Sequence, residues 1–359
     1  MFTPSRLILA RQKRGLSKKE LANLVGLSLQ SISNFESENN KEIPSEKTLE
    51  KIAKALEFPI AFFQKTKIDF IATGASFRAL SKMTASQRNS SLASGSLAFE
   101  LNDWFELEFV LPRHELPDLR DETPESAAVY MRNLWQLGEE PIDNITHLLE
   151  SNGIRIYYIA EDCHNVDAFS IWNNGTPFIL LNTLKSGERS RFDAAHELAH
   201  LVLHKHGVPR SKNAEQEANL FAAEFLMPKT RMLSQGTYIP TFENLIKHKH
   251  YWKVSLSALA YRLRALGLLT EWQHRTLVID ISKNKYNVSE PMPLEKEISQ
   301  IFSKIFAILK QEGMSKKMIA EKLSIPYKDF QKLTLGIMDI EGKNLGGGLP
   351  SSQFLKRIK

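Results

Sequence analysis

The sequence contains a single cysteine, Cys163, and no apolar run long enough to cross a membrane. One thiol excludes an intramolecular disulfide and a zinc cage built from cysteines, and it suits a reducing compartment. Residues 1–10 also lack the basic start, the long apolar run and the small-residue cleavage site of a signal peptide. We therefore expect a cytoplasmic protein with no membrane contact.

The excess of positive over negative charge is also small. The 359 residues carry a formal net charge of only +6, so the total charge gives little reason to expect nucleic-acid binding. The distribution is more informative, because the first 19 residues contain basic side chains and no acidic one. These basic residues are Arg6, Arg11, Lys13, Arg14, Lys18 and Lys19. An ordinary solvated helix face would explain them equally well.

A helix start follows this basic segment. Ser17 and Glu20 have the S-x-x-E spacing of a capping box, so a helix should begin near Lys18. Gly26 allows a sharp turn after that helix, and Ser28 can cap the next one. Two short helices joined by such a turn are typical of a DNA-binding helix-turn-helix.

The second of these helices has an inner face formed by Ile32 and Phe35, which directs its other side chains outward. Gln30 and Asn34 lie one turn apart, and their amides can pair with the edge of adenine in the major groove. Lys18 and the basic residues of the first helix would lie near phosphates. The predicted DNA contacts are Lys18, Ser28, Leu29, Gln30, Ser31 and Asn34. A helical bundle used only for protein contacts is the alternative.

Three runs carry the motif: Leu16-Ser17-Lys18-Lys19-Glu20-Leu21-Ala22, Gly26-Leu27-Ser28 and Ile32-Ser33-Asn34-Phe35-Glu36. With them, residues 6–63 resemble the XRE-type helix-turn-helix family. The resemblance implies a five-helix domain that usually acts as a homodimer on a two-fold operator of double-stranded DNA.

The rest of the chain alternates between helical and strand-like patterns. A linker rich in Ser, Thr, Ala and Gly is expected at residues 73–96, and an apolar helix at 97–111. Further helices are expected at 127–137, 145–151, 186–228, 242–269 and 295–335. Short strands are expected at 154–159, 168–172, 177–181 and 276–281. Asn173, Asn174 and Gly175 favour a tight hairpin between two of these strands.

Two features mark the C-terminal part. The run Gly313-Met314-Ser315-Lys316-Lys317 faintly repeats Gly15-Leu16-Ser17-Lys18-Lys19, and a helix-like apolar pattern follows each run. One repeated run of this kind does not establish a repeat array. Gly346, Gly347, Gly348 and Pro350 indicate a loose terminus.

His196-Glu197-Leu198-Ala199-His200 is an H-E-x-x-H sequence. At 3.6 residues per turn, His196 and His200 project from one face of a helix, where they can share a zinc ion. Glu197 beside them is the expected general base. Ser186 can cap this helix, and the helix has an apolar stripe of Phe192, Ala195, Ala199, Val202 and Leu203.

Two histidines require a third protein ligand. His206 stands where a metzincin would place one, but Leu203 occupies the position at which that arrangement needs glycine. His204 continues the stripe of His196 and His200, yet it lies another turn along and is too far away to complete a tetrahedron. It is better suited to a position at the surface or behind a ligand.

The helix expected at residues 214–227 offers a better ligand. Glu215 and Asn219 lie on one face of it, while Phe221, Ala222 and Phe225 would pack inward. Glu215 can then bind zinc while Asn219 braces a ligand histidine. Glu217 points elsewhere on this helix and is the runner-up ligand.

The sequence Phe192-Asp193-Ala194-Ala195-His196-Glu197-Leu198-Ala199-His200, together with Glu215-Gln216-Glu217-Ala218-Asn219 and the following residues to Pro228, resembles the ImmA/IrrE-type metallopeptidase family. The similarity covers at least residues 154–228, including Asp167-Ala168-Phe169-Ser170. It implies a zinc endopeptidase whose members commonly cut transcriptional repressors and so switch on stress or prophage genes. Regulators that join such a domain to an XRE-type head are similar to this chain over most of its length.

These observations predict an α+β, mostly helical chain with four parts. They are a helix-turn-helix domain at 1–66, a linker and helical connector at 67–125, a zincin-like metallopeptidase domain with a small β-sheet at 126–290, and a helical region with a flexible tail at 291–359.

The predicted function is that of a DNA-binding transcriptional regulator with a coupled, gluzincin-like zinc endopeptidase that controls a stress, prophage or defence response. Its substrate would be a partner repressor or the protein itself. Glu197 would take a proton from water and pass it to the leaving amine. The oxyanion could be stabilised by any of Tyr157, Tyr158, His204 and His206. The alternative is an XRE-type repressor that senses zinc or a ligand without proteolysis.

Overall fold

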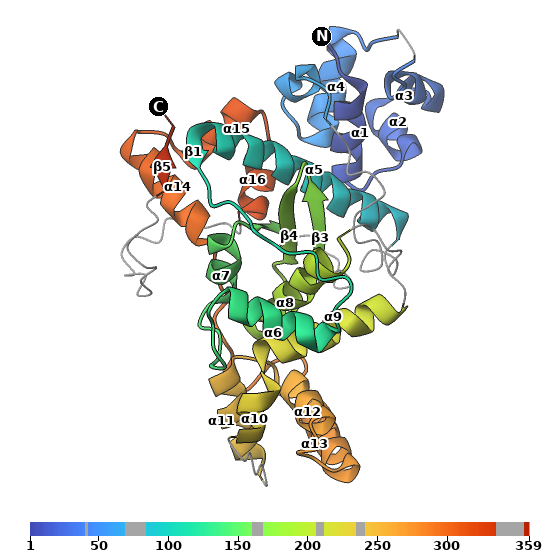
Figure 1. Ribbon diagram of the computed structural model, residues 1–359. Coiled ribbons are helices and arrows are strands. Elements are labelled where there is room, and N and C mark those ends of the chain that lie inside the picture. Colours follow the sequence, from blue (N-terminus) through green and yellow to red (C-terminus); the bar gives the residue numbers. More distant parts are fainter. Residues whose placement is uncertain are drawn as a thin grey trace. The chain divides into compact units, whose positions relative to one another are not determined.

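Figure 1 shows a computed structural model of the chain, which describes residues 1–39, 42–68, 84–159, 168–205, 212–234, 241–334 and 355–358. The chain forms two compact units. The first comprises Met1–Arg113, Tyr157–Val166 and Ser299–Lys359, and the second comprises His114–Ile156 and Asp167–Ile298. Helices dominate both units, which confirms the predicted fold class. No helix among the described residues is long and apolar enough to cross a membrane.

The first unit begins with four α-helices and a 3-10 helix, in agreement with the five-helix expectation. These are α1 (Pro4–Lys13), α2 (Lys18–Val25), α3 (Leu29–Phe35), α4 (Glu46–Leu56) and η1 (Ile60–Gln64). Ser17 and Glu20 make both hydrogen bonds of the capping box at the start of α2. Gly26 ends α2 with a φ of 68°, and the Ser28 side chain caps α3. The helix-turn-helix therefore has the local structure that its sequence predicts.

A long helix, α5 (Ala85–Glu108), follows and packs against α1. The predicted linker at 73–96 is therefore wrong from Ala85 onward, where Thr84 and Gln87 form a second capping box. The small side chains that favoured a linker instead allow close helix packing. Ser90 Oγ, for example, is buried and donates a hydrogen bond of 2.8 Å to the carbonyl oxygen of Lys13.

The C-terminal region returns to the first unit as three helices, in agreement with the predicted helical region at 295–335. They are α14 (Gln300–Gln311), α15 (Lys316–Leu323) and α16 (Tyr327–Leu333). The Phe105 ring on α5 lies 5.7 Å from that of Phe302 and 6.2 Å from that of Phe306 on α14. Strand β1 (Phe109–Val110) pairs antiparallel with β5 (Lys356–Arg357).

The second unit is largely helical around a small sheet. Its helices are α6 (Pro124–Leu134), α7 (Ile145–Ser151), α8 (Gly187–Leu203), α9 (Lys212–Leu226), α10 (Lys229–Ser234), α11 (Phe242–Trp252), α12 (Leu256–Ala265) and α13 (Glu271–Lys283). The sheet contains β3 (Ala168–Asn173) and β4 (Thr176–Asn182) of this unit and β2 (Arg155–Ile159), of which Tyr157–Ile159 are assigned to the first unit, in the order β2-β4-β3. Helix α8 packs on β3 and β4 and also on α9, which in turn packs on α6.

The hairpin between β3 and β4 has the predicted tight turn, but Asn173 belongs to β3 and the turn consists of Asn174 and Gly175. Asn174 and Gly175 both have positive φ, 48° and 79°, which is the backbone that twisted antiparallel strands require. The turn sets a register in which Ser170 lies opposite Ile179. This register decides which side chains of β3 face α8.

The strand predicted at residues 276–281 is wrong, because this segment lies inside α13. Its Thr, Val and Ile side chains have a high intrinsic strand propensity. Thr270 and Gln273, however, form a capping box immediately before the segment, so a helix starts there. The helix-start signal outweighs the local propensity.

A buried ion pair fixes the start of α8. Lys249 on α11 is fully buried, and its Nζ donates to Glu188 Oε1 at 2.6 Å and to the carbonyl oxygen of Pro291 at 2.9 Å. Burial raises the pKa of Glu188, but hydrogen bonds from Lys249 and from the Leu294 amide outweigh it and lower that pKa overall. The pair therefore joins α8, α11 and the segment that precedes α14.

We predict that Lys249→Met lowers the free energy of unfolding by about 3–5 kcal/mol, because Glu188 stays buried without its cation. Urea unfolding of the full chain measures this. Lys247→Met is the matched control, since Lys247 on the same helix is exposed and its exposed pair with Glu243 should contribute little to stability. Equal losses in the two variants would contradict the prediction.

The lowered pKa of Glu188 also sets a pH dependence. Because the folded-state pKa lies below its ordinary value of 4.5, the unfolded chain binds the proton more readily in acid. The contribution of the pair is complete above about pH 4.5 and is lost as the pH falls through the lower folded-state value. In the Lys249→Met variant, this acid-side loss of stability should become smaller.

Candidate metal centre

Helix α8 carries the H-E-x-x-H sequence and is held by an apolar face. Ser186 caps it by accepting a hydrogen bond from the Arg189 amide, as predicted. Its apolar residues Ala195, Leu198, Ala199 and Val202 are fully buried. Because this face packs against neighbouring elements, the rotation of the helix is fixed, and with it the direction of the two histidines.

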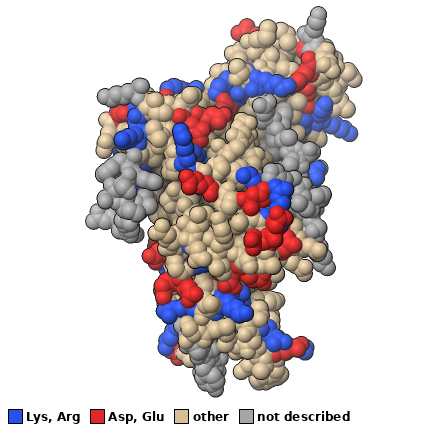
Figure 2. Space-filling view, in the orientation of Figure 1, with Lys and Arg blue, Asp and Glu red and all other residues tan. Residues whose placement is uncertain are grey.

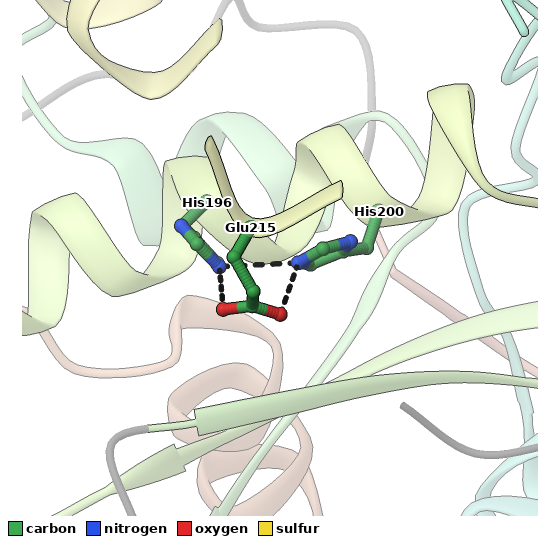
Figure 3. Close-up of side chains that lie close together, drawn as sticks. All are labelled: His196, His200 and Glu215. Atoms are coloured by element: carbon green, nitrogen blue, oxygen red, sulfur yellow. Dashed lines mark hydrogen bonds and ion pairs between the residues drawn. The ribbon is translucent and has the colours of Figure 1, made fainter. Parts of the chain in front are cut away.

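Figure 3 shows His196 and His200 of α8 converging with Glu215 of α9. The Nε2 atoms of the two imidazoles are 3.1 Å apart. Glu215 Oε2 lies 3.5 Å from Nε2 of His196, and Glu215 Oε1 lies 3.7 Å from Nε2 of His200. The three side chains thus form a compact triangle of nitrogen and oxygen donors.

This triangle has the size that a tetrahedral metal ion requires. Bonds of about 2.0–2.1 Å from zinc to nitrogen and oxygen place neighbouring ligand atoms about 3.3–3.4 Å apart. The two nitrogens are 3.1 Å apart, and each lies 3.5 or 3.7 Å from a different oxygen of the Glu215 carboxylate, so the observed distances are close to that value. With one donor atom taken from each residue, all three lie within 4.8 Å of one another. Two imidazoles and one carboxylate also form a donor set that zinc commonly uses in catalytic sites. The residues present therefore fit a zinc ion.

The second nitrogen of each imidazole has a polar partner. His196 Nδ1 lies 3.0 Å from Asn219 Oδ1, an atom that can only accept. His200 Nδ1 lies 2.8 Å from His204 Nδ1, and His204 Nε2 lies 2.8 Å from Glu217 Oε2. A proton held on each ligand's Nδ1 by these partners leaves its Nε2 lone pair directed into the triangle.

The structure separates the candidates for the third ligand. Glu215 lies in the triangle, whereas Glu217 contacts His204, so the two acidic residues have different partners. His204 is the first residue after α8 and contacts His200 through its ring nitrogen. His206 lies outside the described residues.

Glu197 is directed to the sheet side of α8. Its carboxylate is buried, and Ser170 Oγ on β3 donates a hydrogen bond of 2.6 Å to Glu197 Oε2. A base whose carboxylate is held by a fixed donor has a defined direction, which proton transfer requires.

Ser170 is a contact that the sequence did not identify. Its place in a strand was predicted, but a strand pattern does not say which helix residue a side chain meets. Among the groups considered for the oxyanion, Tyr157 packs its ring 5.1 Å from that of Phe302 in the first unit. Tyr158 is also buried.

The predicted DNA contacts lie together on and around α3. Leu29 and Gln30 are exposed, while Ile32 and Phe35 are buried, as the helical pattern predicts. Gln30 Nε2 donates to Asn34 Oδ1 at 2.8 Å, so the two amides form a linked pair on the helix surface. Ser28 and Ser31, which are engaged in capping α3, lie beside them.

Most of the basic residues of α1 do not lie where the sequence interpretation placed them. Arg6 and Arg11 are buried and pair with Glu100 and Glu36, and Lys13 is also buried. They bind within the protein instead of facing phosphates, because a buried guanidinium must be neutralised. Lys18, although 3.5 Å from Glu36, keeps 41% of its side chain exposed.

The surface carries no dominant basic field on the face shown in Figure 2. There, Lys and Arg side chains are interspersed with Asp and Glu side chains. This distribution agrees with the small net charge of +6. Attraction of DNA would therefore depend on a few local cations.

Comparison with known families identifies both parts. A model of the IrrE N-terminal-like domain, a peptidase family, matches residues 149–264. A helix-turn-helix model matches residues 7–63. No curated protein matches the chain. The first match contains the His196, His200 and Glu215 triangle, and the second contains α2 and α3. The chain thus joins an XRE-type helix-turn-helix DNA-binding domain to a metallopeptidase-family domain of the IrrE N-terminal-like type.

Proposed function

We propose that this protein is a transcription regulator with a zinc-dependent endopeptidase activity. The observation that carries the proposal is the triangle of His196, His200 and Glu215, with the Glu197 carboxylate one position from the first ligand and held by Ser170. A metal site without a nearby base would support storage or structure alone. The buried base in the same helix supports hydrolysis.

In this proposal, His196, His200 and Glu215 hold zinc, which supplies Lewis-acid polarisation of the scissile carbonyl and lowers the pKa of water. Asn219 and the pair of His204 and Glu217 keep the two ligand imidazoles oriented.

Glu197 takes the proton from the attacking water and gives it to the leaving amine. Ser170 fixes one carboxylate oxygen of Glu197. Strand β3 lies at an edge of the three-stranded sheet, and an extended peptide can add to such an edge by main-chain hydrogen bonds. The substrate class is then a protein segment that can become extended.

We further propose that the substrate is a repressor or this chain itself, and that cleavage controls a stress, prophage or defence response. The support is the fusion of the two domains, because a peptidase attached to a DNA-binding head is carried to regulated promoters. Binding of a two-fold operator as a homodimer belongs to the same proposal.

We predict that the protein binds one zinc ion per chain, and that His196→Ala, His200→Ala and Glu215→Ala each abolish it. Each substitution removes one of the three donors. Elemental analysis after dialysis measures the metal content. Glu217→Ala is the control: it should keep the stoichiometry at saturating zinc while weakening affinity about 10–100-fold, since Glu217 acts through His204. Full metal content in Glu215→Ala, with loss in Glu217→Ala, would reverse the assignment of the third ligand.

Glu197→Gln should retain zinc and fold but reduce peptide cleavage by about 100- to 10,000-fold, because an amide cannot accept the proton. Mass spectrometry of the zinc-loaded protein incubated with candidate repressors measures cleavage. Equal cleavage by the variant and its parent would exclude the proposed mechanism. If neither protein cuts any substrate while both bind zinc, the domain is a sensor of metal or ligand instead of a peptidase.

The DNA contacts are testable separately. Gln30→Ala and Asn34→Ala should each lower the preference for a selected operator over random duplex by about 1–3 kcal/mol, because their amides read base edges. Lys18→Ala should weaken both duplexes about equally and reduce the salt dependence by about one phosphate contact. Fluorescence anisotropy at several salt concentrations measures both effects. Loss of preference in Lys18→Ala alone would show that α3 is not the reading helix.

A further inference from the structure

The C-terminal helices α14, α15 and α16 repeat the first three helices of the DNA-binding domain. Each residue of the second set lies 298 positions after its counterpart, so Ser315 corresponds to Ser17 and Phe330 to Ile32, with no insertion or deletion between them. Helices α2 and α15 both contain 8 residues, and α3 and α16 both contain 7. The faint sequence echo is therefore the start of a complete structural repeat.

The turns of the two sets agree in detail. Gly15 and Gly313 both have positive φ, 67° and 77°. Ser315 caps α15 by accepting from the amide three residues on, just as Ser17 caps α2. The residue after each helix is left-handed, Gly26 with φ 68° and Ser324 with φ 55°. Serine adopts this left-handed backbone less readily than glycine does. The second set therefore keeps the turn although Ser324 favours it less than Gly26 does.

The buried positions agree as well. In the first set, α2 and α3 bury Leu21, Ala22, Val25, Ile32 and Phe35. The corresponding residues of α15 and α16, all buried, are Ile319, Ala320, Leu323, Phe330 and Leu333. One additional position is buried in the second set: Asp329, the counterpart of Ser31. The repeat thus has the core of a helix-turn-helix and one charged residue where the first copy exposes a hydroxyl.

Asp329 binds the DNA-binding domain. Its carboxylate, 2% exposed, accepts hydrogen bonds from Arg14 Nη1 at 3.1 Å and Nη2 at 2.8 Å. Arg14 also donates from Nε to the carbonyl oxygen of Leu56 at 2.7 Å, which ties it to the end of α4. A bidentate pair of this kind, with its carboxylate buried and its guanidinium partly exposed, has strict geometry. It therefore sets the position of α16 against the ends of α1 and α4.

A second contact supports the same arrangement. Lys65, directly after η1, donates to the carbonyl oxygen of Leu323 at 2.7 Å and to Glu100 at 2.5 Å. Leu323 ends α15, so the turn between α15 and α16 is held as well as α16 itself. The Arg14 contact joins the repeat to the domain of residues 7–63, and the Lys65 contact joins it to the segment directly after that domain.

We propose that residues 300–334 are a second helix-turn-helix unit that binds the first one through α16, so that its recognition helix contacts protein instead of DNA. The position that corresponds to the predicted DNA contact Ser31 is occupied by a buried carboxylate engaged with Arg14. A carboxylate would also repel phosphates. The partner of this surface is the N-terminal domain of the same chain, and the repeat links that domain to the segment following the peptidase.

The test is amide hydrogen exchange of the full-length chain, measured for peptides from α16 and from the C-terminal half of α1. Asp329→Asn and Arg14→Gln should each accelerate exchange in both segments by about tenfold or more, because each removes a charge-assisted pair. The double variant should exceed neither single variant by more than about twofold, since both substitutions remove the same bidentate pair of Arg14 with Asp329. Lys317→Gln, an exposed change on α15, is the control and should alter neither segment.

Arg14→Gln keeps the test decisive if Asp329→Asn unfolds the repeat, because Arg14 lies outside it. Acceleration confined to the substituted element in both variants would overturn the proposal.

A duplex selected from a random library by the full-length protein tests the opposite role, in which α16 binds DNA. Lys328→Ala with Lys332→Ala, at the counterparts of Gln30 and Asn34, should leave the preference for it unchanged. Loss of that preference would show that α16 reads DNA and would also overturn the proposal.

Discussion

The candidate centre depends on the burial of α8. One face of this helix is apolar and fully buried, so the helix cannot rotate without exposing it. A second constraint of the same kind fixes the rotation of α9, because its inward residues Phe221, Ala222 and Phe225 are also fully buried. With both rotations fixed, His196, His200 and Glu215 are brought within 4.8 Å of one another. Hydrophobic packing thereby concentrates three polar groups that would not otherwise approach one another.

Such a cluster has an electrostatic cost that its surroundings reduce. His200 is 4% exposed and Glu197 is 2% exposed, and buried polar groups require partners. Asn219, His204 and Ser170 provide these partners from three different elements. Each of them also fixes a direction, of an imidazole or of a carboxylate. Groups that satisfy hydrogen bonds around the triangle therefore also preorganise it for a metal and for proton transfer.

The first unit shows one local fold used twice. The serine cap of α2, the left-handed turns and the buried positions recur in α14–α16, so both copies form the same helices, although Pro326 replaces the capping Ser28 before α16. Their surfaces have diverged, and a single exchange from serine to aspartate changes what one helix binds. Ser31 stays at the surface of α3, whereas Asp329 forms a buried pair with Arg14. In the proposal made above, the same supersecondary structure serves two kinds of recognition.

The features that the sequence determined are local. Capping boxes, the Asn174-Gly175 turn and the spacing of His196 and His200 involve residues within a few positions of one another, so their geometry follows from the helix or turn itself. The family resemblance also rests on short motifs, so it too could be recognised from the sequence. One local prediction is wrong: residues 276–281 have strand propensity, but the capping box of Thr270 and Gln273 starts a helix that includes them.

Tertiary structure decided the contacts between elements distant in the chain. Glu215 and Glu217 are equally acidic and two positions apart, and only the packing of α9 on α8 places one in the triangle and the other against His204. The basic residues of α1 were expected at DNA, but Arg6 pairs with Glu100 and Arg11 with Glu36. Sequence shows which charges are present, whereas only the fold determines which are buried, and a buried charge must be paired.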